Sequence, residues 1–182
     1  MDGRTALSLD GATFRLAAAR EAIVALNLIN PEAEGIIWHM LDFRLTDHPK
    51  ARTTAYRKDG EQLSADEKRA LGLRSKAFLS RRALAEISPK GMVSPLEAHE
   101  KTLLRASFSL FRYRAIQNPP EIDGFEIAYK IDVLNMACPV CKTLDGKIVT
   151  GNDAPMFALP RCECETANFG LVAFVDWLSG IG

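Results

Sequence analysis

Apolar residues recur at helical spacing over most of the first two thirds of the chain. Leu16, Ile23 and Leu26 follow the 3.6-residue period, and Asp10 precedes them as a cap. A second helix begins at Asn30-Pro31, because asparagine can cap a helix and proline fits its first position. Its apolar residues are Ile37, Trp38, Met40, Leu41 and Leu45.

The pattern fails between about residues 46 and 62. This stretch contains turn-forming residues such as Asp59-Gly60 and few apolar side chains. We therefore predict a polar loop here, which is either flexible or ordered by a partner, with His48 exposed and inert.

Helical patterns resume after this loop. Ser64 and Glu67 have the spacing of a capping box, and Gly72 ends the short helix that they begin. Ser75 is a cap for the next helix, which is expected to bury Phe78, Leu79, Ala83 and Ile87.

The longest predicted helix starts at a second capping box, Ser94-Pro95-Leu96-Glu97, and continues to about Gln117. Its apolar stripe is wide enough for burial on more than one side, so we expect it to be the central helix. The stripe contains Leu96, Leu103, Leu104, Ala106, Phe108, Leu110, Phe111 and Tyr113.

Asn118-Pro119-Pro120 closes the helical part, and residues 125–131 then alternate between apolar and polar as a strand does. Asp145-Gly146 forms a turn after which Lys147–Thr150 can pair back as a second strand. The segment 169–178 is too apolar to stay in water, so we expect it to pack on the body or on a partner.

All four cysteines lie within 27 residues of this last part. Cys138 and Cys141 have the C-x-x-C spacing that places two thiolates on one turn, and Cys162 and Cys164 form a C-x-C pair 20 residues later. This separation is typical of the two halves of a four-cysteine zinc site. Because four thiolates fill a tetrahedral zinc, such a site is structural rather than catalytic.

Three other interpretations of the cysteines stay open. Two disulfides would also use four cysteines, although a chain of 182 residues with 47% hydrophobic content can form a core without them. A redox C-x-x-C would follow a strand and open a helix, whereas Leu144-Asp-Gly-Lys147 is typical of a turn. Unligated buried thiols are the third alternative, and their clustering speaks against it.

These patterns predict a mainly α protein with a small β/loop zinc-binding module, α+β overall. The predicted domains are a helical body over residues 1–118, with the loop at about 46–62, and a cysteine-rich module over residues 119–182 that ends in the apolar segment.

The formal net charge of the chain is zero, so only the distribution of charged residues along it is informative. Lys and Arg total 23, as do Asp and Glu, but residues 50–114 contain fifteen basic and seven acidic side chains. This excess is either a solvated surface or a surface for phosphate or an acidic partner. The candidate residues are Arg74, Lys76, Arg81, Arg82, Lys101, Arg105, Arg112 and Arg114.

Motifs of common enzymes are absent from the sequence. It has no P-loop, no dinucleotide-binding fingerprint, no G-x-S-x-G and no H-E-x-x-H. A zinc deaminase needs His-x-Glu, whereas His99 and Glu100 are adjacent. We therefore expect no enzymatic activity and no catalytic residues.

The cysteine motif, C-P-V-C-x3-D-G-K followed by P-R-C-x-C, resembles the motif near the C-terminus of phage head-morphogenesis (minor capsid) proteins. The resemblance covers about residues 125–165. It is carried by Cys138, Cys141, Asp145, Gly146, Lys147, Pro160, Cys162 and Cys164. It implies a structural role in a virion or prophage-derived assembly, in which the cysteines hold a metal and the helices make assembly contacts.

The expected function is thus that of a non-enzymatic, zinc-binding assembly protein with a protein partner or with copies of itself. The alternative is a zinc-containing nucleic-acid-binding or regulatory protein that uses the basic surface. No apolar run approaches the roughly 18–20 residues needed to span a bilayer, and no secretory signal is visible at Met1–Arg4. We expect an intracellular, cytoplasmic protein without membrane contact, and the resemblance adds virion association.

Overall fold

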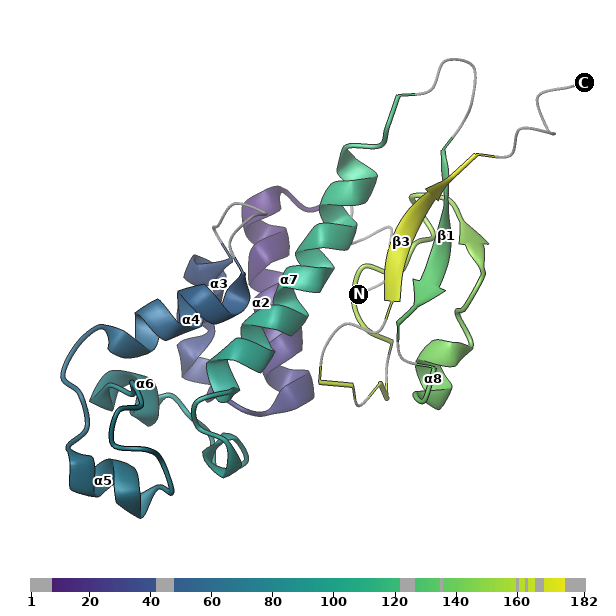
Figure 1. The fold of residues 1–182 in the computed structure, drawn as a ribbon. Helices are drawn as coiled ribbons and strands as arrows, with labels where there is room; N and C mark the ends of the chain where they lie inside the picture. Colours follow the sequence, from purple (N-terminus) through teal and green to yellow (C-terminus); the bar gives the residue numbers. More distant parts are fainter. Residues whose placement is uncertain are drawn as a thin grey trace, which may run out of the picture. The chain divides into compact units, whose positions relative to one another are not determined.

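The computed structural model describes residues 8–41, 48–121, 127–134, 136–159, 161–162, 164–165 and 169–175. Within these ranges the chain is an α+β protein with seven α-helices and one small antiparallel sheet, as predicted (Figure 1). The elements are α2 (Gly11–Leu26), the 3-10 helix η1 (Pro31–Ala33), α3 (Glu34–Met40), α4 (Pro49–Lys58), α5 (Ala65–Ala70), α6 (Arg81–Ala85), the 3-10 helix η2 (Gly91–Val93), α7 (Ala98–Gln117), β1 (Ala128–Val133), α8 (Pro139–Lys142), β2 (Ile148–Val149) and β3 (Phe169–Phe174).

The chain divides into two compact units that are not continuous in sequence. Residues 19–106 form one, here called the helical unit. Residues 1–18 together with 107–182 form the other, here called the cysteine unit. Both boundaries fall inside helices, α2 and α7.

Of the predicted caps, Asp10 and Ser64 act through their side chains, whereas Asn30 precedes η1 without a side-chain cap hydrogen bond. Asp10 accepts hydrogen bonds from the backbone N–H groups of Ala12 and Thr13, both at 2.9 Å. The bond from the Thr13 N–H lowers the pKa of the Asp10 carboxyl. Ser64 and Glu67 form the full capping box of α5, and Gly72 follows that helix with a positive φ of 69°.

The core of the helical unit contains most of the predicted apolar stripe. The largest fully buried residues of this core come from the segment before η1, from α3 and the residue after it, from the segment before α6, and from α7. They include Ile29, Ile37, Leu41, Leu79 and Leu103. Leu45 lies outside the described residues.

The predicted polar loop over about 46–62 is wrong in its centre, because Pro49–Lys58 form the helix α4. His48 caps this helix through Nδ1, which accepts from the Lys50 N–H at 3.1 Å. The buried residues of α4 are Pro49, Thr53 and Arg57, spaced four apart. The inward stripe therefore contains no large apolar residue, and hydropathy gives no helical signal there.

The helix predicted from Ser75 begins later, as α6, and is capped by Ser80, whose Oγ accepts from the Ala83 N–H at 3.3 Å. The preceding residues pair instead with the segment before α5: Gln62 and Ser80 form an isolated bridge, and the Leu63 N–H donates to the Leu79 carbonyl at 3.1 Å. Leu79, Ala83 and Ile87 are buried, as predicted. Phe78 is instead 47% exposed, with the Lys58 ammonium 4.6 Å from its ring centroid.

The predicted helix start at the capping box Ser94–Glu97 is wrong, because Ser94 follows η2 and residues 95–97 form a turn; α7 starts at Ala98 and ends at Gln117 as predicted. Burial extends around several of its sides, which confirms the expectation of a central helix. The buried set includes polar as well as apolar residues, namely Thr102, Leu103, Arg105, Ala106, Ser107, Ser109, Leu110, Arg112 and Tyr113.

The cysteine unit contains the sheet, in the strand order β2-β1-β3 with both pairs antiparallel (Figure 1). Tyr129, Ile131 and Val133 of β1 are buried, whereas Lys130 and Asp132 are exposed, so one face of the sheet is covered. As far as it is described, the predicted apolar segment 169–178 forms β3, which pairs with β1, and its Phe169 ring lies 4.4 Å from the Arg112 guanidinium of α7. Residues 176–178 lie outside the described residues.

Aromatic stacking joins the two sequence segments of the cysteine unit. The ring of Phe14 in α2 lies 4.1 Å from that of Tyr113 in α7 and 5.3 Å from that of Phe157, measured between centroids. The Tyr113 hydroxyl also donates to the Leu9 carbonyl at 2.7 Å. The start of α2 is therefore part of this core.

A close backbone approach in the helical unit requires glycine at position 91. The Ser88 hydroxyl accepts from the Gly91 N–H at 3.1 Å and donates to the Asn27 carbonyl at 2.6 Å. A Cβ on Gly91 would lie 1.9 Å from the Leu28 carbonyl oxygen, which is backbone and cannot rotate away. Only glycine lets these two segments meet.

We expect Gly91→Ala to lower the free energy of unfolding by about 2 kcal/mol or more, because the backbone must shift to admit the methyl group. Gly35→Ala in α3 is the matched control, since its Cβ would meet nothing within 4 Å. That change should raise stability by about 0.5–1 kcal/mol through helix propensity. Urea unfolding of both variants checks the pair, and equal effects would contradict the role assigned to Gly91.

Candidate metal centre

The first cysteine pair lies on a single helical turn. Cys138 precedes α8 with extended backbone angles, as a residue before proline prefers, and Pro139 starts the helix. The Lys142 N–H donates to the Cys138 carbonyl at 3.0 Å, and the Leu144 N–H donates to the Cys141 carbonyl at 2.9 Å. This turn brings both sulfurs of C-x-x-C to the same side.

The Asp-Gly-Lys sequence attaches this turn to the sheet. Gly146 has a positive φ of 72°, and its N–H donates to the Ile131 carbonyl at 2.9 Å. The Ile131 N–H donates in return to the Lys147 carbonyl at 2.8 Å, and the Asp145 carboxylate accepts from the Val133 N–H at 3.2 Å. The predicted turn is confirmed, and its three residues hold the first cysteine pair against β1.

The second pair lies on an irregular turn. The Cys162 N–H donates to the Leu159 carbonyl at 3.0 Å, and Arg161 between them has a φ of 68°. A residue with a side chain adopts this left-handed conformation at a cost of about 1–2 kcal/mol. The neighbouring residues Pro160 and Glu163 lie outside the described residues.

The four sulfurs converge on one point. All of them lie within 4.8 Å of one another, and the sulfurs of Cys141 and Cys162 are 3.3 Å apart. Tetrahedral zinc–thiolate bonds of 2.3 Å imply sulfur–sulfur distances of about 3.8 Å, which lies inside this range. A disulfide needs about 2.05 Å, and no pair among the four cysteines forms one. The arrangement is that of a structural metal site.

The cluster is embedded in an apolar core. Cys141 is fully buried, Cys138 and Cys162 are 9% and 8% exposed, and Cys164 is half-buried. The core around them contains Ile131, Val133 and Phe169, with Val140, Leu144, Val149, Ala158 and Leu171 packed on its edge. Hydrogen bonding from the backbone N–H of Cys141, aided by the thiols of Cys164 and Cys141, lowers the pKa of the Cys138 thiol to about 7. Backbone N–H groups thus favour the thiolate, the form that binds metal.

This geometry favours a metal site over a two-cysteine redox site. The C-x-x-C does open a helix, but α8 is a single turn of four residues that ends before the turn at Asp145-Gly146. A redox pair has no need of a second cysteine pair at bonding distance, whereas tetrahedral metal binding requires it.

Arg112 of α7 fixes two segments that border the cysteine core, a role that the sequence did not reveal. Its guanidinium is 4% exposed and donates to the carbonyls of Met156 at 2.9 Å and Phe169 at 3.1 Å. It also donates to the Ser109 hydroxyl at 3.2 Å and lies 4.4 Å from the centroid of the Phe169 ring. One side chain thereby fixes the loop before Cys162 and the first residue of β3.

The predicted anion or partner surface is wrong for two of its eight residues, because Arg105 and Arg112 are buried. Arg105 is 3% exposed, and its guanidinium binds both carboxylate oxygens of Glu21, the shorter bond being 2.6 Å.

Three further members of that set form ion pairs on the surface. Arg81 pairs with Glu61 and Glu67, Arg82 pairs with Asp59, and Lys101 pairs with Glu97. Arg74 and Lys76 are exposed and Arg114 is half-buried. Carboxylates therefore compensate much of the positive charge that the sequence places between residues 50 and 114.

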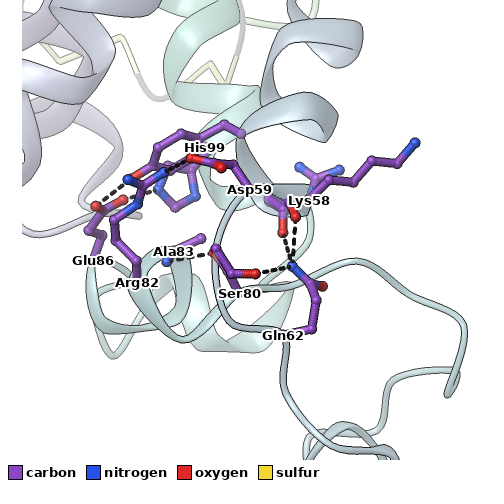
Figure 2. A network of polar contacts seen from close by, with 11 residues as sticks. Lys58, Asp59, Gln62, Ser80, Arg82, Ala83, Glu86 and His99 are labelled. Atoms are coloured by element: carbon purple, nitrogen blue, oxygen red, sulfur yellow. Dashed lines mark hydrogen bonds and ion pairs between the residues drawn. The ribbon is translucent and has the colours of Figure 1, made fainter.

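A polar network in the helical unit is the other feature that sequence reasoning missed (Figure 2). Glu86 accepts from the Tyr56 hydroxyl at 2.5 Å and lies 2.9 Å from Nε2 of His99, which is fully buried. Burial alone would raise the pKa of the Glu86 carboxyl, but its hydrogen bonds with His99 and Tyr56 lower it overall. Arg82 stacks 4.7 Å from the Tyr56 ring centroid. Full burial of His99 makes this network a packing feature rather than a site open to substrate.

The fold and the cluster together define an α+β protein with a four-cysteine candidate metal centre. Comparison of the chain with protein-family models, with curated proteins and with solved structures gives no match. Among the described helices, none combines the length and the apolar character that crossing a bilayer requires.

We expect Arg112→Gln to lower the free energy of unfolding of the cysteine unit by about 2–4 kcal/mol, because two buried carbonyls lose a charged donor. Arg114→Gln, two residues away and half-buried, is the control and should change stability by about 0.5 kcal/mol or less. Thermal unfolding monitored by NMR signals of β1 and β3 measures the difference. Equal stability of the two variants would show that Arg112 does not hold the module.

Proposed function

We propose that the protein is a non-enzymatic structural protein whose cysteine unit is held together by one zinc ion. The convergence of four sulfurs within 4.8 Å carries this proposal. Zinc fits because Zn²⁺ is redox-inert and accepts four thiolates in a tetrahedron. Four protein ligands leave no coordination position for water, so the centre supplies folding energy rather than catalysis.

The resemblance of the cysteine motif to phage head-morphogenesis proteins supports an assembly role. Seven of the eight shared residues lie in the described part of the chain and have a local task there: the cysteines converge, and Asp145-Gly146-Lys147 fastens the first pair to β1. A motif whose described positions all serve the metal module is what a structural part of a larger assembly requires. We therefore propose a virion or prophage-derived assembly protein.

The proposed partner is a protein, either another component or a copy of this chain. Ile148 and Val172 both lie opposite Lys130 in the sheet and are 54% and 53% exposed. Both therefore share the uncovered face of the sheet. Phe169, which the sequence offered for the same contact, is 1% exposed and belongs to the core. The contact thus uses the outward residues of the apolar segment.

Nucleic-acid binding through the basic helices is the weaker candidate. Two of its central arginines, Arg105 and Arg112, are buried and hydrogen-bonded within the protein. Salt-dependent binding to phosphates requires exposed cations.

The purified protein should contain about one zinc per chain, because structural thiolate sites bind zinc with roughly 10–16 kcal/mol. Cys141→Ser should abolish zinc binding and unfold the cysteine unit. Thr143→Ser, an exposed position just past the same helical turn, should retain the metal. Elemental analysis with NMR of both variants provides the measurement. A protein without metal, with four thiols that react at the rate of exposed cysteines, would contradict the proposal.

Val172→Asp should weaken self-association or partner binding without loss of zinc, because it places a charge on the uncovered sheet face. Ala173→Asp is the neighbouring exposed control on the same strand, with its side chain directed to the other face. Sedimentation velocity of the two variants at low and high salt compares them. An association that both variants retain, or that high salt abolishes, would contradict an apolar contact here.

A further inference from the structure

The four sulfurs of the cluster are not equally accessible. A pocket of about 570 Å³ opens beside the centre, and it is bordered by one cysteine from each pair, Cys138 and Cys164. Among the described residues, its wall also includes Ala137, Pro139, Val140, Arg161 and Glu165. Cys141 and Cys162 do not border it. The centre thus has an outer and an inner pair of sulfurs.

The inner pair is protected by packing. Cys141 is fully buried and its sulfur lies 3.3 Å from that of Cys162, within the core formed by Ile131, Val133 and Phe169. Cys164, in contrast, is the only one of the four that is half-buried. A small molecule that enters the pocket therefore meets Cys164 and Cys138 first.

The chemistry of the pocket suits an oxidant. Metal-bound cysteine sulfurs are thiolates, the form that attacks peroxides. Arg161 and Glu165 line the same pocket, so its wall is polar and admits a small hydrophilic oxidant. The two outer sulfurs lie within 4.8 Å of each other, so a short movement brings them to bonding distance.

We propose that Cys164 and Cys138 are an oxidation site through which hydrogen peroxide opens the metal centre. The Cys164 sulfur attacks one peroxide oxygen, the O–O bond breaks, and a sulfenic acid and hydroxide form. The Cys138 thiolate then attacks the Cys164 sulfur and expels the second hydroxide. Two thiolates lose two electrons to give one disulfide, and peroxide gains them; two protons convert the hydroxides to water.

Release of the metal follows from the ligand count. A disulfide between the outer sulfurs leaves only Cys141 and Cys162 as thiolates, and two ligands do not hold zinc against a chelator. The module then loses the free energy that metal binding contributes to its fold. This inference rests on the proposed zinc site, to which it adds control by oxidation.

The test treats the purified protein with one equivalent of hydrogen peroxide. Disulfide mapping by mass spectrometry should find Cys138 joined to Cys164 as the first product, with zinc released in step as measured by a chromogenic chelator. Dithiothreitol with added zinc should restore the starting state. A first disulfide that contains Cys141 or Cys162, or retention of zinc after the outer pair is oxidised, would overturn the proposal.

A pocket variant provides the second arm. Ala137→Phe narrows the pocket and should slow the oxidation several-fold, whereas Thr143→Phe, exposed and outside the pocket wall, should leave the rate unchanged. Equal rates in both variants would also overturn the proposal. Absence of zinc from the untreated protein would instead refute the proposed function, and the disulfide map would still decide which sulfurs react.

Discussion

The four cysteine sulfurs lie within 4.8 Å of one another, and as metal-binding thiolates they would repel, which is the constraint around which the cysteine unit is organised. Each pair of unit charges at about 4 Å costs roughly 4 kcal/mol at the effective dielectric constant typical of proteins. Backbone N–H groups relieve part of this cost, as the pKa of Cys138 indicates. A bound divalent cation would relieve most of it. The cluster without a cation would favour protonated, loosely packed thiols, and the strand pairs attached to it would lose their anchor.

In each unit, a buried arginine holds segments together that are distant in the sequence. In the cysteine unit Arg112 donates to the Met156 and Phe169 carbonyls, and in the helical unit Arg105 donates to the Glu21 carboxylate. In each case a cation leaves water and is compensated by two or more strong acceptors, which makes its position specific. Arg57 differs, because its Nε and Nη1 are buried without hydrogen-bond partners. That arrangement costs stability, which the attraction of the Glu100 carboxylate and the hydrogen bond from Nη2 to the Thr54 hydroxyl offset in part.

The sequence could predict those parts of the protein in which local chemistry decides the structure. The capping box at Ser64, the turn at Asp145-Gly146 and the convergence of the cysteines all follow from residue type and short spacing. Helix α4 could not be predicted, because Thr53 and Arg57 take inward positions that usually belong to apolar residues. The burial of Arg105 and Arg112 on α7 could not be predicted either. Helical spacing shows that they share a side of the helix, but not what packs against that side. Contacts between distant segments decide whether a basic stripe is a surface or a core.

The order of segments in the two units has a consequence for dissecting the molecule. Topologically, the helical unit is an insertion: the chain leaves the cysteine unit within α2 and re-enters it within α7. A fragment cut at residue 107 would keep every cysteine but lose Phe14, whose ring stacks on Tyr113 and Phe157. A minimal metal module would therefore join residues 8–18 to residues 107–175 through a short linker. The same connectivity allows the inserted unit to diverge or to be exchanged while the metal centre retains its own fold.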